Sequence, residues 1–198
     1  LQRKSKTLEV RVNGRLPAGV GAKDVILAII GQIGTAGGTG YVIEYTGEAI
    51  RHMTMEQRLT VCNMSIEAGA RAGLVSPDAV TFAYLEGREY LPSRPFDELV
   101  AEWSAWASDP GCAYDRVVEL DASTLEPQVT WGTSPGMVTG VSGKTPVLEA
   151  LSDANDRLAA RKALEYMGLD EGVPIQAIRP NVVFIGSCTN GRIEDMRE

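Results

Sequence analysis

A strand, a tight turn and the start of a helix form the pattern of the stretch Asn181-Val-Val-Phe-Ile-Gly-Ser-Cys-Thr-Asn-Gly-Arg-Ile-Glu-Asp-Met-Arg197. Residues 182–185 are β-branched or aromatic, which predicts a strand in a sheet covered on both faces. The next residues are turn formers, and Ile193 and Met196 have helical spacing. This strand–turn–helix order predicts an α/β fold.

Cys188 lies in the predicted turn, where the end of a strand meets the start of a helix. Such a place favours a thiolate and offers backbone N–H groups to an anion. A nucleophilic cysteine usually needs a histidine as its base, and the sequence has one histidine, His52. Cys62 and Cys112 show no metal-ligand spacing. The residues alone therefore leave Cys188 as an inert thiol or as one ligand of a site completed outside this sequence.

The composition is that of a globular protein, with 44% hydrophobic and 23% charged residues in a chain of 198. No apolar run has the length of a membrane span and no signal peptide opens the sequence, so we expect no membrane partner. Three cysteines without a disulfide pattern favour a reducing, cytoplasmic location. The net charge of −7 argues against nucleic acid as a partner. Both ends look cut, and we expect a fragment of a longer protein.

A second informative stretch is a helix predicted from Thr54 to Gly73. Thr54-Met-Glu-Gln57 fits a capping box. Asn63 and Glu67 are four residues apart and would share one helix face among small or apolar neighbours. A partly buried carboxylate there would suit acid–base chemistry. The alternative is an exposed ion pair between Glu67 and Arg71, also four residues apart.

The remaining elements follow from periodicity and breakers. Strands are predicted at residues 7–12, 41–45 and 114–120, and helices at residues 22–33, 76–86, 96–107 and 155–167. Asn13-Gly14 is a hairpin signal. The glycine-rich residues 34–41 form either a flexible turn or a cradle for an anion. A composition shift near residues 120–127 predicts a domain boundary, with one unit at residues 1–120 and another at residues 121–198.

Four stretches together resemble the aconitase superfamily: residues 34–45, 60–70, 127–135 and 184–195. Cys-Asn-Met at residues 62–64 and Ser-Cys-Thr-Asn at residues 187–190 are specific to the superfamily. Gly-Gly-Thr-Gly-Tyr and Trp-Gly-Thr-Ser-Pro are more similar to members that act on isopropylmalate than to aconitase. The likeness covers essentially the whole chain. It implies three-layer α/β domains of the aconitase type, with the second domain and the start of the third in this chain.

The resemblance implies a [4Fe–4S] cluster held by three cysteines. Cys188 matches the first of them, and the other two are expected beyond residue 198. Asn63 and Glu67 match the family's active-site residues beside the cluster. Glu67 would hydrogen-bond the hydroxyl that leaves the substrate, and Asn63 would orient groups at the same site.

The activity implied is that of a hydro-lyase that interconverts 2- and 3-isopropylmalate through isopropylmaleate in leucine biosynthesis. A small dicarboxylate would be the substrate, and a separate small subunit would close the cleft. Two alternatives stay open. One is a homoaconitase-like or aconitase-like dehydratase of another small di- or tricarboxylate. The other is that the chain alone is a non-catalytic fragment that binds the small subunit.

Overall fold

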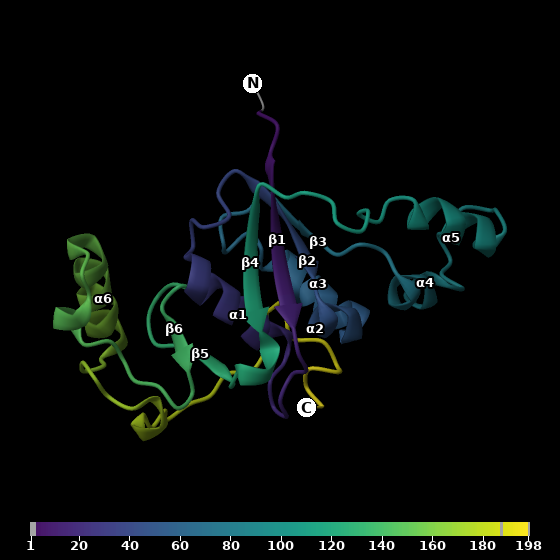
Figure 1. Cartoon of the computed structure of the whole chain (residues 1–198). Coiled ribbons are helices and arrows are strands. Elements are labelled where there is room, and N and C mark those ends of the chain that lie inside the picture. The colour runs from purple at the N-terminus through teal and green to yellow at the C-terminus, as the bar shows by residue number, and fades with distance from the viewer. Residues whose placement is uncertain (1–2, 187, 198) are drawn as a thin grey trace.

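A four-stranded parallel sheet is the centre of the computed structural model, which describes residues 3–186 and 188–197 (Figure 1). The strand order is β3-β2-β1-β4, and each neighbouring pair is parallel. The strands are β1 (Lys6–Asn13), β2 (Tyr41–Thr46), β3 (Ala72–Leu74) and β4 (Arg116–Asp121). Helices connect these strands, so the predicted α/β class is confirmed.

The first strand–helix–strand unit builds the main core. Leu8, Val10 and Val12 alternate along β1, so they share one face of the sheet, and all three are fully buried. They join one buried cluster with the apolar side of α1 (Ala22–Ile33), which links β1 to β2. Full burial of each such aliphatic side chain contributes about 1.5–3 kcal/mol. The predictions at residues 7–12, 22–33 and 41–45 are confirmed.

The hairpin predicted at Asn13-Gly14 is wrong. Gly14 does turn the chain, with φ of 80°, but the chain then enters α1. β1 pairs in parallel with both β2 and β4, whereas a two-residue hairpin joins antiparallel strands. The Asn-Gly pair therefore marks a turn, and the apolar helix α1 that follows determines which strand pairs with β1.

The second face of the sheet holds a buried carboxylate, Glu44 of β2, which is 8% exposed. Its oxygens accept hydrogen bonds from the hydroxyls of Ser76 at 2.6 Å, Ser108 at 2.6 Å and Tyr114 at 2.9 Å. Hydrogen bonds to a charged acceptor contribute about 1.5–3 kcal/mol each. Because Ser76 follows β3 and Tyr114 precedes β4, Glu44 fastens both ends of the intervening segment to the sheet.

That intervening segment forms an arm with two helices, α4 (Ala79–Leu85) and α5 (Phe96–Ser104), which extends away from the sheet (Figure 1). Trp103 packs between two rings, with its centroid 6.3 Å from that of Phe82 and 6.0 Å from that of Phe96. These ring contacts therefore pack the arm against itself.

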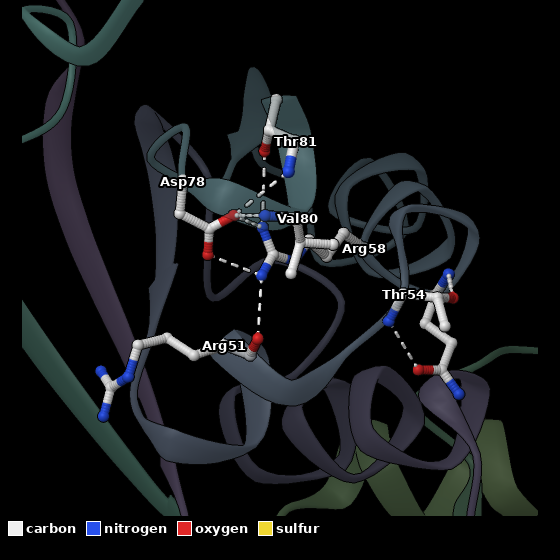
Figure 2. A network of polar contacts seen from close by, with 7 residues as sticks. Arg51, Thr54, Arg58, Asp78, Val80 and Thr81 are labelled. Carbon is white, nitrogen blue, oxygen red and sulfur yellow. Dashed lines mark hydrogen bonds and ion pairs between the residues drawn. The ribbon is translucent and has the colours of Figure 1, made fainter. Parts of the chain in front are cut away.

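The base of the arm is tied to α3 (Met55–Asn63) by Arg58 and Asp78 (Figure 2). The Arg58 guanidinium donates two hydrogen bonds to the Asp78 carboxylate, at 2.7 and 2.8 Å. Asp78 also accepts from two N–H groups of the first turn of α4. It is therefore the N-cap, and α4 begins at Ala79, later than the predicted start.

One short helix of the first half, α2 (Glu48–His52), lies between β2 and α3. The second half of the chain holds a smaller sheet and one long helix. Its elements are the antiparallel pair β5 (Gln128–Thr130) and β6 (Val138–Gly140), α6 (Ala154–Met167), and 3-10 turns at Ala122–Thr124, Leu148–Ala150 and Ile175–Ala177. α6 ends at Met167, as predicted, and Gly168 follows in the left-handed conformation with φ of 65°. None of the helices in the described part of the chain has the length and hydropathy to cross a bilayer. The domain boundary near residue 120 stays a prediction.

The strand predicted at residues 182–185 is wrong. The four side chains are 72–84% exposed, and the segment pairs with none of the described strands. A strand needs neighbours for its N–H and C=O groups, and an apolar run supplies the propensity without supplying a partner. The helix expected after it is reduced to single turns, such as that closed by Met196 N–H and the Arg192 carbonyl at 3.2 Å.

Candidate functional site

An open surface pocket of about 380 Å³, called the cavity below, lies where three separate parts of the chain meet. They are the first turns of α1, the turn that follows α3, and the loop between β5 and β6. Its wall carries one ammonium, one carboxylate and three hydroxyl groups beside apolar side chains. The lining residues are Lys23, Leu27, Met64, Glu67, Thr130, Gly132, Thr133, Ser134 and Pro135. These groups suit a small, hydroxylated, anionic molecule.

Glu67 lines this cavity, but the helix predicted to carry it ends too early. α3 stops at Asn63, and residues 64–69 form successive turns closed by bonds such as Gly69 N–H to the Ile66 carbonyl at 2.8 Å. The chain must reverse here to enter β3, and Gly69 permits this with a left-handed φ of 82°. As a result Glu67 is exposed, whereas partial burial was expected.

Asn63 lies at the last residue of α3, is exposed, and is not part of the cavity wall. The predicted common helix face of Asn63 and Glu67 is therefore wrong. The alternative ion pair is also wrong, because the Arg71 guanidinium donates to the Arg3 carbonyl at 2.7 Å and the Ser5 hydroxyl at 3.3 Å. Among the described residues, Glu67 has no ion-pair partner. The catalytic roles of both residues stay predictions.

The glycine-rich residues 34–41 support the turn that carries Glu67. The N–H of Gly38 donates to the Ala68 carbonyl at 2.8 Å. A Cβ at Gly69 would lie 2.8 Å from the Thr35 carbonyl oxygen. Close backbone approach at Gly37 and Gly38, and left-handed φ values at Gly34 and Gly40, account for the glycines of this stretch without an anion.

Asp24 places the β5–β6 loop beside α1. One of its carboxylate oxygens accepts from the Gly21 N–H at 2.8 Å and caps the helix, while the other accepts from the Gln128 N–H of β5 at 2.6 Å. This double contact brings residues 130–135 next to Lys23. Sequence reasoning missed Lys23, although a signal was present. A cation in the first turn of a helix opposes the helix dipole and needs another explanation.

Cys188 lies beside the cavity's cation. Its side chain is exposed, and its sulfur is 3.7 Å from the Lys23 ammonium nitrogen. This position excludes an inert thiol packed in hydrocarbon. Arg192 holds the cysteine's turn against α3, since it donates to the Thr60 hydroxyl at 2.9 Å and to the Thr189 carbonyl at 2.8 Å. Ser187 of the predicted motif lies outside the described residues.

The other cysteines differ from Cys188 in their surroundings. Burial raises the pKa of the Cys62 thiol to about 11, so this side chain stays protonated at neutral pH. Cys112 is exposed on the opposite side of the sheet, beside Tyr114 and Glu44. In the part of the chain that is described, no three His, Cys, Asp or Glu side chains gather as a metal site. Within the described residues, a metal bound at Cys188 would therefore have no second and third ligand of these types.

Comparison with known proteins identifies the family of the chain. The sequence profile of the aconitase family (aconitate hydratase) matches residues 1–198. The chain is 55% identical over 194 residues to the 3-isopropylmalate dehydratase large subunit of Bifidobacterium longum subsp. infantis, and 55% identical over 194 residues to that of Bifidobacterium longum strain DJO10A. Each match covers 98% of this chain and 42% of the relative. The chain belongs to the aconitase family.

Proposed function

We propose that the protein containing this chain is a hydro-lyase that interconverts 2- and 3-isopropylmalate through isopropylmaleate. One observation carries the proposal: a single cavity joins Glu67, Lys23 and the hydroxyls of residues 130–135, and the Cys188 sulfur contacts Lys23. The ammonium and hydroxyl groups suit the carboxylates and hydroxyl of such a substrate. The names of the relatives, which are isopropylmalate dehydratase large subunits, support the same choice.

Cys188 fits the role of one thiolate ligand of a [4Fe–4S] cluster. Its sulfur is accessible, and the nearby Lys23 ammonium offsets the negative charge that thiolates and cluster sulfides bring. Further ligands would come from residues outside this chain. When bound, such a cluster supplies a Lewis-acidic iron that polarises the hydroxyl and a carboxylate of the substrate.

Glu67 is assigned as the group that gives a proton to the departing hydroxyl. In the forward direction its carboxyl group gives a proton to the oxygen as the C–O bond breaks, so the oxygen leaves as water. A base outside the described residues takes a proton from the neighbouring carbon, and the electron pair of that C–H bond forms the C=C bond as the C–O bond breaks. Water then adds in the opposite orientation. Its hydroxyl goes to the carbon that lost the proton, and a proton goes to the carbon that lost the hydroxyl, which completes the isomerisation. Asn63, which precedes the same turn, is assigned a positioning role.

The assembly follows from the same proposal. A separate small subunit would complete the cleft, and the enzyme would work in leucine biosynthesis in the cytoplasm, without nucleic acid or membrane as a partner. Residues 1–120 would contain the end of the first aconitase-like domain and the second, and residues 121–198 the start of the next. The large-subunit names of the relatives support the subunit partner.

The substrate is tested with the full-length large subunit and its small subunit, reconstituted anaerobically with iron and sulfide. We expect turnover of 2- and 3-isopropylmalate, and little turnover of citrate or homocitrate. Turnover of citrate or homocitrate without isopropylmalate would instead assign a homoaconitase-like or aconitase-like dehydratase.

A second candidate applies to the 198-residue chain by itself. Because its described residues offer no set of three metal ligands, the isolated chain would be a non-catalytic part that binds the small subunit. One cysteine is too few for a cubane cluster, which usually takes four ligands, or three when one iron is left open.

A further inference from the structure

We propose that Lys23 is a positioning residue that acts through Cys188. Its ammonium donates to the cysteine sulfur and so holds the thiolate at the cavity and stabilises a cluster bound there. This inference rests on the proposed function, because it assumes that Cys188 is a cluster ligand. It adds a residue from α1 to a site that the sequence assigned to two other segments.

The position of Lys23 is not explained by the stability of α1. Lys23 is the second residue of the helix, where the positive end of the dipole makes a cation unfavourable. Its neighbour Asp24 already caps the helix through the Gly21 N–H. The helix would therefore be at least as stable with a neutral residue at position 23.

The contacts of Lys23 point to the sulfur. Among the described residues, its ammonium takes part in one hydrogen bond, with the Cys188 sulfur at 3.7 Å. It forms no ion pair there, although Glu67 lines the same cavity. The charge is therefore available to the thiolate and to whatever occupies the cavity.

The physical consequence concerns the charge on the cluster. An N–H donor and a positive charge beside a thiolate ligand stabilise the more negative, reduced form of a cluster and raise its reduction potential. Outer contacts of this kind also change metal affinity by about 10–100-fold. Loss of the charge should therefore lower both the potential and the retention of iron.

The test compares Lys23→Gln with Lys23→Arg in the full-length large subunit, reconstituted anaerobically with iron and sulfide. Lys162→Gln is the matched control, because Lys162 is an exposed lysine on α6. An EPR-monitored titration with dithionite gives the midpoint potential, and iron per protein after a chelator challenge gives retention. For Lys23→Gln we expect a tenfold shift toward the oxidised form, or about 59 mV for a one-electron couple, together with faster iron loss.

The outcomes separate the two claims. Lys23→Arg should keep the potential near that of the wild type, and Lys162→Gln should leave it unchanged. If the wild type assembles its cluster and Lys23→Gln matches it in potential and retention, the role of Lys23 is refuted while the proposed function stands. A Lys23→Arg variant that behaves like Lys23→Gln would also refute it. A wild type that assembles no cluster would refute the proposed function itself.

Discussion

Glu67→Gln is expected to lower the turnover of isopropylmalate by about 10²–10⁴-fold in the full-length enzyme, the range typical of a lost general acid–base group. Glutamine keeps the size of the side chain but cannot give or take the proton at the departing hydroxyl. Steady-state kinetics with the small subunit present provide the measurement. Iron per protein should equal that of the wild type, because Glu67 is not assigned as a ligand.

The matched control for this prediction is Glu165→Gln, which changes an exposed glutamate on α6, away from the cavity wall. It should retain wild-type turnover. Full activity of Glu67→Gln would show that the turn after α3 has a structural role only. Loss of iron together with activity would instead place Glu67 in the support of the cluster.

Asp78→Ala is expected to destabilise the fold by about 3–5 kcal/mol, the usual effect of leaving one charge of a buried pair without its partner. The side chain of Arg58 is 3% exposed, and Figure 2 shows its guanidinium between the Asp78 carboxylate and the Arg51 carbonyl. Its buried Nε already has no partner among the described residues. Loss of the Asp78 carboxylate would therefore leave still more of the guanidinium's N–H groups unpaired. Urea denaturation provides the free energy of unfolding.

Substitution of the other residue of the pair, Arg58, should destabilise the fold less than Asp78→Ala does. Arg58→Met places an apolar chain of similar length in the buried space, and the Asp78 side chain, which is 34% exposed, can be hydrated. We therefore expect a loss of about 1–3 kcal/mol. The double variant should cost less than the sum of the two single ones. Arg94→Met, which removes exposed ion pairs with Glu98 and Glu102, is the control and should cost less than about 1 kcal/mol. Equal, small losses for Asp78→Ala and Arg94→Met would contradict the proposed role of the buried pair.

The same pair predicts a pH dependence. Burial alone would raise the pKa of Asp78, but hydrogen bonds from Arg58 and from the N–H groups of Thr81 and Val80, together with the Arg58 charge, lower it. A lowered pKa in the folded state gives stability that is present above the unfolded value of about 3.9 and is lost as pH falls through the folded value. The stability advantage of the wild type over Asp78→Ala should therefore be constant near neutral pH and shrink below about pH 4.

Elements set by local signals could be predicted from the sequence. The periodic apolar residues of α1 and the alternation in β1 give both elements directly, and Thr54 caps α3 through Gln57 as its motif indicates. The elements that failed depend on distant partners. Residues 182–185 have the composition of a strand, but a strand also needs a neighbour that no local pattern supplies. Asn13-Gly14 marked a turn correctly, and the parallel pairing of β1 overrode its hairpin preference.

The candidate site could be predicted only in part, because it also depends on contacts between distant parts of the chain. The motifs named Glu67 and Cys188, and the structure places Glu67 in the cavity wall and Cys188 beside Lys23 of that wall. The geometry of the first was wrong, because α3 ends at Asn63 and Gly69 turns the chain toward β3. Lys23 could not be found from motifs, since its proximity to a residue 165 positions away depends on how the C-terminal turn packs.

The most direct measurement is the iron and EPR signal of Cys188→Ser in the full-length large subunit after anaerobic reconstitution. Cys112→Ser is the matched control, because Cys112 is the other exposed cysteine of the described chain. We predict that Cys188→Ser loses or greatly weakens the [4Fe–4S] signal, while Cys112→Ser keeps the signal and iron content of the wild type. A Cys188→Ser protein with a full, stable cluster and normal turnover would contradict the central claim.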